Sequence, residues 1–155
     1  MNKTVKLAEV SALMTEVLES GGEVSFITAG TSMLPLLRDR CDKVILVKNK
    51  NMPQKNDVVF YKRDDGQYVL HRIVGVKKDK FIIRGDNLWS NEHGITTKHI
   101  IAIATAFERN GKLIKCTDFK YKLYCFCLPV IRFFKRPKLS VINLLIKIKL
   151  KTKGG

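Results

Sequence analysis

Apolar and polar residues recur first with a helical period and then with a strand period along this chain. Over residues 5–19 the apolar side chains lie three and four positions apart, whereas the glutamates occupy other positions. This spacing predicts an amphipathic helix, and Gly21-Gly22 is expected to end it. A single helix of this length is too short to form a DNA-binding helix-turn-helix domain.

From residue 24 onward the pattern changes to short runs rich in β-branched and aromatic residues, separated by turn residues. Such runs are typical of a mainly antiparallel sheet. The expected strands cover residues 24–28, 43–47, 57–62, 68–77, 80–84 and 100–109. Hairpin turns are predicted at residues 62–67 and 109–112, the second because Asn110-Gly111 accommodates positive φ. The sequence therefore predicts a mainly β fold.

Length and composition narrow the class of protein. The 155 residues are 45% apolar with only 10 glycines and 4 prolines, which fits one compact domain and excludes collagen-like, low-complexity and wholly disordered chains. No charge-free stretch approaches the roughly 20 residues of a spanning helix, and the N-terminus lacks the apolar run of a secretory signal. The four cysteines have no metal-ligand spacing, so we expect no metal, no cofactor, no disulfide framework and a reducing compartment.

The formal net charge of +15 is unevenly distributed. Residues 1–111 hold 17 basic and 13 acidic side chains, whereas residues 112–155 hold 12 basic side chains and one acidic side chain. We therefore expect an N-terminal amphipathic helix over residues 1–22, a nearly balanced domain over residues 23–111, and a basic apolar extension over residues 112–155.

Three interpretations of the extension stay open. Residues 121–134 interleave aromatic and aliphatic side chains with Lys122 and Arg132, which is typical of a peripheral segment on an anionic membrane surface. Basic and aromatic residues also suit nucleic acid, but the aliphatic side chains of residues 139–150 favour the membrane. Alternatively the extension completes the core or adds an edge strand, as the alternation over residues 146–151 permits.

The segment around Ser32 is the first candidate for chemistry. Small residues, Gly30 and Thr31, precede this serine, and Pro35 follows it. Small flanking residues allow close approach of a substrate, and a turn or helix beginning at Ser32 would offer backbone N–H groups to an oxyanion. An ordinary loop or helix cap is the alternative interpretation.

A serine nucleophile needs a base, and His71 is the candidate. It lies in a strand-like run whose period of two places it on the same face as Val69 and Ile73, where a satisfied core histidine is the alternative. His93 and His99 lie in polar loop context and are expected to be solvated. An unperturbed imidazole predicts that activity falls as the pH drops through about 6.5.

Asp86 follows the predicted strand 80–84 and either turns a carboxylate toward the sheet or forms an ordinary Asp-Asn turn. Together with the two segments above, it resembles the signal peptidase I clan of serine endopeptidases, which includes self-cleaving repressors. The resemblance covers residues 24–106 as five boxes in matching order: Gly30-Thr31-Ser32-Met33-Leu34-Pro35, Cys41-Asp42-Lys43-Val44, Asn56-Asp57-Val58-Val59-Phe60-Tyr61, His71-Arg72-Ile73-Val74-Gly75 and Arg84-Gly85-Asp86-Asn87.

The resemblance implies a signal-peptidase-like antiparallel β fold, with Ser32 as nucleophile and His71 as base. Histidine at that box, in place of lysine, is similar to the endoplasmic-reticulum, archaeal and Gram-positive branch. In that branch acidic residues assist the base, so Asp86 is expected to orient the imidazole together with Glu92, which stands where the family usually has aspartate.

The nucleophile box also implies an oxyanion hole formed by Gly30, Thr31 and Ser32, and substrate contacts by Met33 and Pro35. Gly30 stands where family members often have a serine, so Thr31 or a main-chain N–H must take over that role. Cys41 and Asn56 replace turn glycines, and of these two only asparagine readily adopts left-handed geometry.

The expected function is therefore a serine endopeptidase that cleaves signal or leader peptides after small residues. The extension would hold it at an anionic membrane surface, and a cytoplasmic location beside a leader-peptide maturation system is the other option. Two further functions stay open: a peptidase-fold binding module with weak or no activity, and a self-cleaving repressor-type peptidase, although the latter normally uses a lysine base.

Overall fold

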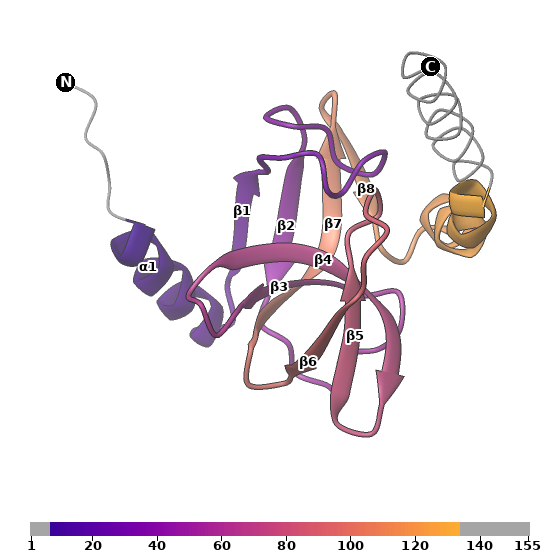
Figure 1. Ribbon diagram of the computed structural model, residues 1–155. Helices are drawn as coiled ribbons and strands as arrows, with labels where there is room; N and C mark the ends of the chain where they lie inside the picture. Colours follow the sequence, from indigo (N-terminus) through magenta and orange to yellow (C-terminus); the bar gives the residue numbers. More distant parts are fainter. Residues whose placement is uncertain (1–6, 134–155) are drawn as a thin grey trace, which may run out of the picture. The chain divides into compact units, whose positions relative to one another are not determined.

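The structure is a computed structural model that describes residues 7–133. The chain divides into two compact units, and the division falls between Asp118 and Phe119. The first unit holds an N-terminal helix and an eight-stranded antiparallel sheet, and in the second the described residues 119–133 are helical (Figure 1). The prediction of a mainly β, antiparallel fold is confirmed at this level.

Helix α1 (Leu7–Glu19) ends as its sequence predicts. Gly21 has a φ of 84°, and the N–H groups of Gly21 and Gly22 bond to the carbonyls of Leu18 and Val17 at 3.1 and 2.9 Å. The strands are β1 (Glu23–Ile27), β2 (Lys43–Val47), β3 (Val58–Lys62), β4 (Tyr68–Lys77), β5 (Lys80–Arg84), β6 (Glu92–Thr96), β7 (Ile100–Arg109) and β8 (Lys112–Lys115). All of them are predicted from the sequence except β6, which is mostly polar, and β8, which has only four residues.

The sheet has the strand order β1-β2-β7-β3-β4-β5-β6, with β8 also paired to β7. Figure 1 shows it as a strongly twisted sheet with α1 beside β1. The long strand β4 changes partner along its length, because residues 68–72 pair with β3 whereas residues 72–77 pair with β5. Arg72 lies opposite both Val58 and Arg84, at the point where the two hairpins overlap.

One hydrophobic core lies under the β3–β6 part of the sheet. Its buried members are Val59, Tyr61, Ile73, Phe81, Ile83 and Ile95, with Val69, Ile100 and Ile103 packed against them. Val69 and Ile73 flank His71 on the same strand face, as the period of two predicts. His71 is only 5% exposed, so the histidine lies at the margin of this core.

Both predicted hairpin turns are present. Gly66 has a φ of 87° in the β3–β4 turn, and Asn110 and Gly111 have φ values of 51° and 73° in the β7–β8 turn. Since β8 pairs with β7, the sheet continues past the boundary expected at residue 111, and the second unit begins at Phe119. Residues 134–155 lie outside the described residues. They include the alternation at 146–151 and the aliphatic side chains of residues 139–150.

Candidate active site

The loop that joins β1 to β2 carries Ser32, and hydrogen bonds close it at its base. The N–H of Arg40 donates to the carbonyl of Thr28 at 2.8 Å, and the N–H of Thr28 donates to the carbonyl of Asp42 at 3.1 Å. Arg40, not Cys41, takes the left-handed conformation in this loop, with a φ of 52°. The cysteine therefore carries none of the strain expected from its replacing a turn glycine.

Buried Asp42 fixes the second half of the same loop. Its carboxylate accepts hydrogen bonds from the backbone N–H of Arg38 at 2.8 Å, from the guanidinium of Arg38 at 2.7 Å, and from Nε of Arg109 at 3.1 Å. These bonds, chiefly those from Arg38, lower the pKa of Asp42 to about 2 despite its burial. Arg109 also donates to the carbonyl of Pro35, so β7 and the serine loop are joined through this carboxylate.

The turn after β5 lies directly against Ser32. The backbone N–H of Asn87 donates to the Ser32 carbonyl at 2.8 Å, and the Asn87 side chain donates to the Thr31 carbonyl at 3.2 Å. A Cβ at position 85 would lie 2.6 Å from the Ser32 carbonyl oxygen, so only glycine fits there. The nucleophile box and the Arg84–Asn87 box, distant in sequence, therefore meet in space.

Asp86 is held by an arginine and not by the histidine. Its two carboxylate oxygens accept from Nε and Nη2 of Arg72, each at 2.8 Å, and both side chains are buried. Arg72 also donates to the carbonyl of Asn56, which has the left-handed φ of 80° expected for that asparagine. Asp86, which was expected to orient the imidazole, thus bonds to Arg72, although it is close enough to act on His71 electrostatically.

Instead, His71 belongs to a chain of hydrogen bonds that ends at Glu92. Nδ1 of His71 lies 3.3 Å from the hydroxyl of Tyr61, and this hydroxyl donates to Glu92 at 2.7 Å. Arg63 completes the chain, since its Nε and Nη2 lie 2.8 and 2.6 Å from the two oxygens of Glu92. The second acidic residue of the expected site therefore reaches the base through a tyrosine.

Burial lowers the pKa of His71 to about 4, against the opposing effect of the nearby Glu92 and Asp86 carboxylates. The imidazole is consequently neutral at pH 7 and can accept a proton. Within residues 7–133 its second nitrogen, Nε2, has no hydrogen-bond partner. An unperturbed imidazole with a pKa of about 6.5 was expected from the sequence, and the burial of His71 contradicts that expectation.

Ser32 is half-buried, and its hydroxyl makes no hydrogen bond to any of the described residues. A hydrogen bond between Ser32 and His71 is thus absent from the part of the chain that the structure describes. The backbone N–H of Ser32 is likewise unpaired there and can donate to an oxyanion. The N–H of Gly30, in contrast, donates to the Asp39 carboxylate at 2.6 Å and is not available.

The other predicted residues lie as follows. Of the two expected substrate contacts, Met33 is buried and Pro35 is exposed. His93 is exposed on β6. His99 is not freely solvated as expected, because its Nδ1 accepts from the N–H of Thr96 at 3.0 Å and its Nε2 lies 3.1 Å from Asp64.

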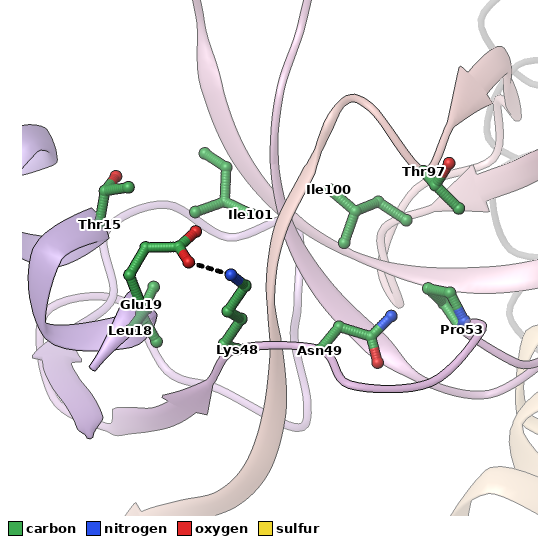
Figure 2. A pocket seen from close by; sticks show the side chains of 9 residues that line it. All are labelled: Thr15, Leu18, Glu19, Lys48, Asn49, Pro53, Thr97, Ile100 and Ile101. Atoms are coloured by element: carbon green, nitrogen blue, oxygen red, sulfur yellow. Dashed lines mark hydrogen bonds and ion pairs between the residues drawn. The ribbon is translucent and has the colours of Figure 1, made fainter. Parts of the chain in front are cut away.

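A cavity of about 350 Å³ lies elsewhere, between the end of α1, the segment that follows β2 and the start of β7 (Figure 2). An ion pair between Lys48 and Glu19 crosses it. Its lining residues are Thr15, Leu18, Glu19, Lys48, Asn49, Pro53, Thr97, Ile100 and Ile101. None of the predicted site residues is among them, and the described residues contain no cluster of His, Cys, Asp or Glu that could hold a metal ion.

Three residues of the site were not predicted from the sequence as site residues: Tyr61, Arg63 and Arg72. The predicted hairpin at residues 62–67 contained the necessary signal, because it places Tyr61 opposite Val69 and hence on the same face as His71. The sequence matches no protein-family model and no curated protein sequence. The assignment of a function therefore rests on the arrangement of these side chains.

Proposed function

We propose that this chain is a serine endopeptidase of the signal peptidase type that cleaves signal or leader peptides after small residues. One observation carries the proposal. The loop of Ser32 is bonded to the turn that contains Asp86, and Asp86 is paired with Arg72, the strand neighbour of His71. The segments that contain Ser32 and Asp86 are thereby bonded to each other and, through Arg72, to the middle of β4, the strand that carries His71.

In the proposed reaction, Oγ of Ser32 attacks the carbonyl carbon of the scissile peptide while Nε2 of His71 takes the hydroxyl proton. The tetrahedral intermediate collapses to an acyl-enzyme, and the same proton passes from Nε2 to the leaving amine. Water then hydrolyses the ester by the same route. The contact between Ser32 and His71 would form with bound peptide, because such bonds are often long in free enzymes.

The oxyanion would be stabilised by the unpaired backbone N–H of Ser32 and its neighbours in the turn. This differs from the expected hole, because the Gly30 N–H is already bonded to Asp39. Asn87 supports the arrangement by fixing the Ser32 carbonyl, so the serine backbone cannot rotate without breaking that bond.

A serine-directed acylating probe tests this proposal on the full chain. We expect a covalent adduct at Ser32, none in Ser32→Ala, and hydrolysis of an Ala-x-Ala peptide that is lost in Ser32→Ala and in His71→Ala. Ser20→Ala, which removes an exposed hydroxyl at the end of α1, is the matched control. Labelling at other serines, or equal hydrolysis in the Ser32→Ala variant, would refute the proposal and favour a non-catalytic module. A loss of intact mass on incubation would point to self-cleavage.

We further propose that the protein attaches peripherally to anionic membranes through the helix at residues 119–133. No helix within residues 7–133 has the length and apolar character needed to cross a bilayer. The helix has two apolar faces. Tyr121, Cys125 and Leu128 are buried on one face, whereas exposed side chains spaced four and three apart line the opposite one: Phe119, Leu123, Phe126, Val130 and Phe133.

Two of the aromatic side chains in this stripe are largely exposed to solvent: Phe119 is 78% exposed and Phe126 is 79% exposed. Lys120 and Lys122 lie beside this stripe, and the stretch 119–133 contains no acidic residue. An apolar stripe with flanking lysines is the arrangement of an interfacial helix on anionic lipid. The 12 basic residues of positions 112–155 add to this attraction.

Co-sedimentation with vesicles tests the attachment. We expect the full chain to bind vesicles of mixed zwitterionic and anionic lipid more strongly than purely zwitterionic ones, and the double variant Leu123→Ser/Phe126→Ser to bind at least tenfold less. Leu113→Ser, which removes an exposed leucine from β8, is the matched control. Unchanged binding of the double variant would refute the proposal. Dimerisation that the double variant abolishes would show that the stripe binds a second copy instead.

A further inference from the structure

Among residues 7–133 no carboxylate bonds directly to the imidazole of His71, which is unusual for a base in a serine peptidase site. Both nearby carboxylates are occupied: Asp86 by Arg72, and Glu92 by Arg63. What touches Nδ1 of His71 is the hydroxyl of Tyr61, at 3.3 Å. The role of this hydroxyl follows from counting its hydrogen-bond donors and acceptors.

Glu92 is ionised at neutral pH, because its hydrogen bonds to Arg63 lower its pKa. An ionised carboxylate only accepts hydrogen bonds, so Tyr61 must donate its single O–H proton to Glu92, at 2.7 Å. Toward His71, the Tyr61 oxygen can then act only as an acceptor. Nδ1 of the neutral imidazole must therefore carry the proton, and Nε2 holds the lone pair.

We propose that Tyr61 is a positioning residue that, held by Glu92, selects the tautomer of His71 in which Nδ1 is protonated and Nε2 is the base. This inference rests on the proposed function for its catalytic consequence. The tautomer itself is a property of the folded chain and is measured without a substrate.

The arrangement is fixed at both ends. The Tyr61 side chain is fully buried in the core of β3 to β6, so its hydroxyl cannot exchange Glu92 for bulk water. Burial and the neighbouring Glu92 also raise the pKa of Tyr61 far above its usual value, so its proton stays in place. Arg63 binds Glu92 through two nitrogens, which prevents this carboxylate from turning away.

The relay also explains how a remote carboxylate assists catalysis. When Nε2 accepts the proton of Ser32, the imidazolium keeps donating from Nδ1 to the Tyr61 oxygen, while Tyr61 keeps donating to Glu92. No proton moves along the relay, and the negative charge of Glu92 stabilises the cation through the polarised hydroxyl. The proton on Nε2 later leaves with the departing amine, so Tyr61 is never consumed or ionised.

Nitrogen-15 NMR of the histidine side chains tests the tautomer in the wild-type chain at pH 7. We expect His71 to show a pyrrole-type Nδ1 and a pyridine-type Nε2. In Tyr61→Phe, which keeps the aromatic ring but removes the acceptor, the Nε2-protonated form should gain population. A wild-type His71 protonated on Nε2 would overturn the inference, as would a tautomer unchanged by Tyr61→Phe.

Kinetics provide the second readout. Tyr61→Phe should lower kcat for the Ala-x-Ala peptide on the order of 100-fold with little change in KM, because the tautomer affects proton transfer rather than binding. Tyr68→Phe is the matched control: Tyr68 stacks on Phe60, no described residue bonds its hydroxyl, and both readouts should be unchanged. An unchanged kcat in Tyr61→Phe would overturn the catalytic role.

Different results would refute the peptidase proposal and the positioning role of Tyr61. If the chain hydrolyses no peptide but shows the Nδ1-protonated tautomer that Tyr61→Phe removes, the peptidase proposal fails and the positioning by Tyr61 stands. If peptides are cleaved in a manner that requires Ser32 and His71, yet His71 is protonated on Nε2, the peptidase proposal stands and the relay is wrong.

Discussion

Two arginine–carboxylate pairs flank His71, and they differ in burial. Arg72 and Asp86 are enclosed, with side-chain exposures of 1% and 0%, whereas Arg63 and Glu92 remain 31% and 24% exposed. The enclosed pair joins β4 to the turn that contacts Ser32. The open pair is the one linked to the imidazole, through Tyr61.

Under the proposed function, this difference in burial separates a structural role from a role in catalysis. Removing one partner of a buried ion pair strongly lowers the free energy of unfolding, because the remaining charge is left buried without a counter-charge or water. A half-exposed pair contributes little to stability but leaves its carboxylate available to a neighbouring hydroxyl. We therefore expect Asp86 to act mainly on the fold, and Glu92 mainly on the chemistry.

Asp86→Asn should have the largest effect on the stability of the protein. It leaves the Arg72 guanidinium buried without its counter-charge, and we expect the free energy of unfolding to fall by about 3–5 kcal/mol. Urea denaturation of the full chain measures this. If the variant is as stable as the wild type and loses only its peptidase activity, Asp86 acts in catalysis. The proposed difference between the two pairs would then be wrong.

The pH dependence of stability should show the next largest effect. The pKa of His71 is about 4 in the folded chain and about 6.5 when unfolded, so between these values the unfolded state binds more protons. The stabilisation is complete above pH 6.5 and is lost as the pH falls toward 4, by about 3 kcal/mol in total.

Urea midpoints between pH 4 and 7 measure this slope, and His71→Gln should flatten it. The buried carboxylate of Asp42, whose pKa is about 2, acts in a separate and more acidic window, because its stabilisation is lost only below its usual pKa. A slope that stays the same in His71→Gln would show that the histidine is not buried in its neutral form.

Glu92→Gln should change stability little and activity more. Because the pair with Arg63 is partly exposed, we expect a loss of no more than about 1 kcal/mol of unfolding free energy. The amide carries no charge to stabilise the imidazolium, so kcat should fall by about tenfold. A stability loss as large as that of Asp86→Asn would contradict the proposed separation of roles.

Arg63→Lys should give the smallest effect. Lysine retains the charge beside Glu92 but loses the two-nitrogen contact, so the carboxylate is held less firmly. We expect a decrease in kcat of about two- to threefold with nearly unchanged stability. The peptide assay and urea denaturation together check this, and a complete loss of activity would indicate that Arg63 contacts substrate directly.

Local patterns determined most of the fold from the sequence. The bounds of β2, β4, β5 and β7 are those expected, because β-branched runs between turn residues define strands locally. β6 (Glu92–Thr96) was not predicted, because it has a single buried side chain, Ile95. Its strand conformation depends on pairing with β5. Its position matters, since Glu92 begins that strand.

Four residues of the candidate site were predicted from the sequence, but their contacts were not. Ser32, His71, Asp86 and Glu92 were all singled out, yet the partner of each carboxylate depended on arginines that no spacing rule connects to them. Asp86 lies 14 positions from Arg72, and Glu92 lies 29 positions from Arg63. Side chains on adjacent strands meet through register, which a single sequence does not show.

From the sequence alone follow the positions of most strands and turns, the gathering of basic charge after residue 111, and the resemblance of the Ser32 and His71 segments to those of serine peptidases. These are local properties of composition and period. The folded chain was needed to show that Asp86 binds Arg72, that Tyr61 stands between Glu92 and His71, and that Gly30 donates its N–H to Asp39. Each donor and acceptor bonds to one of the groups that lie near it in space. Groups that are distant in sequence become neighbours only once the sheet has formed.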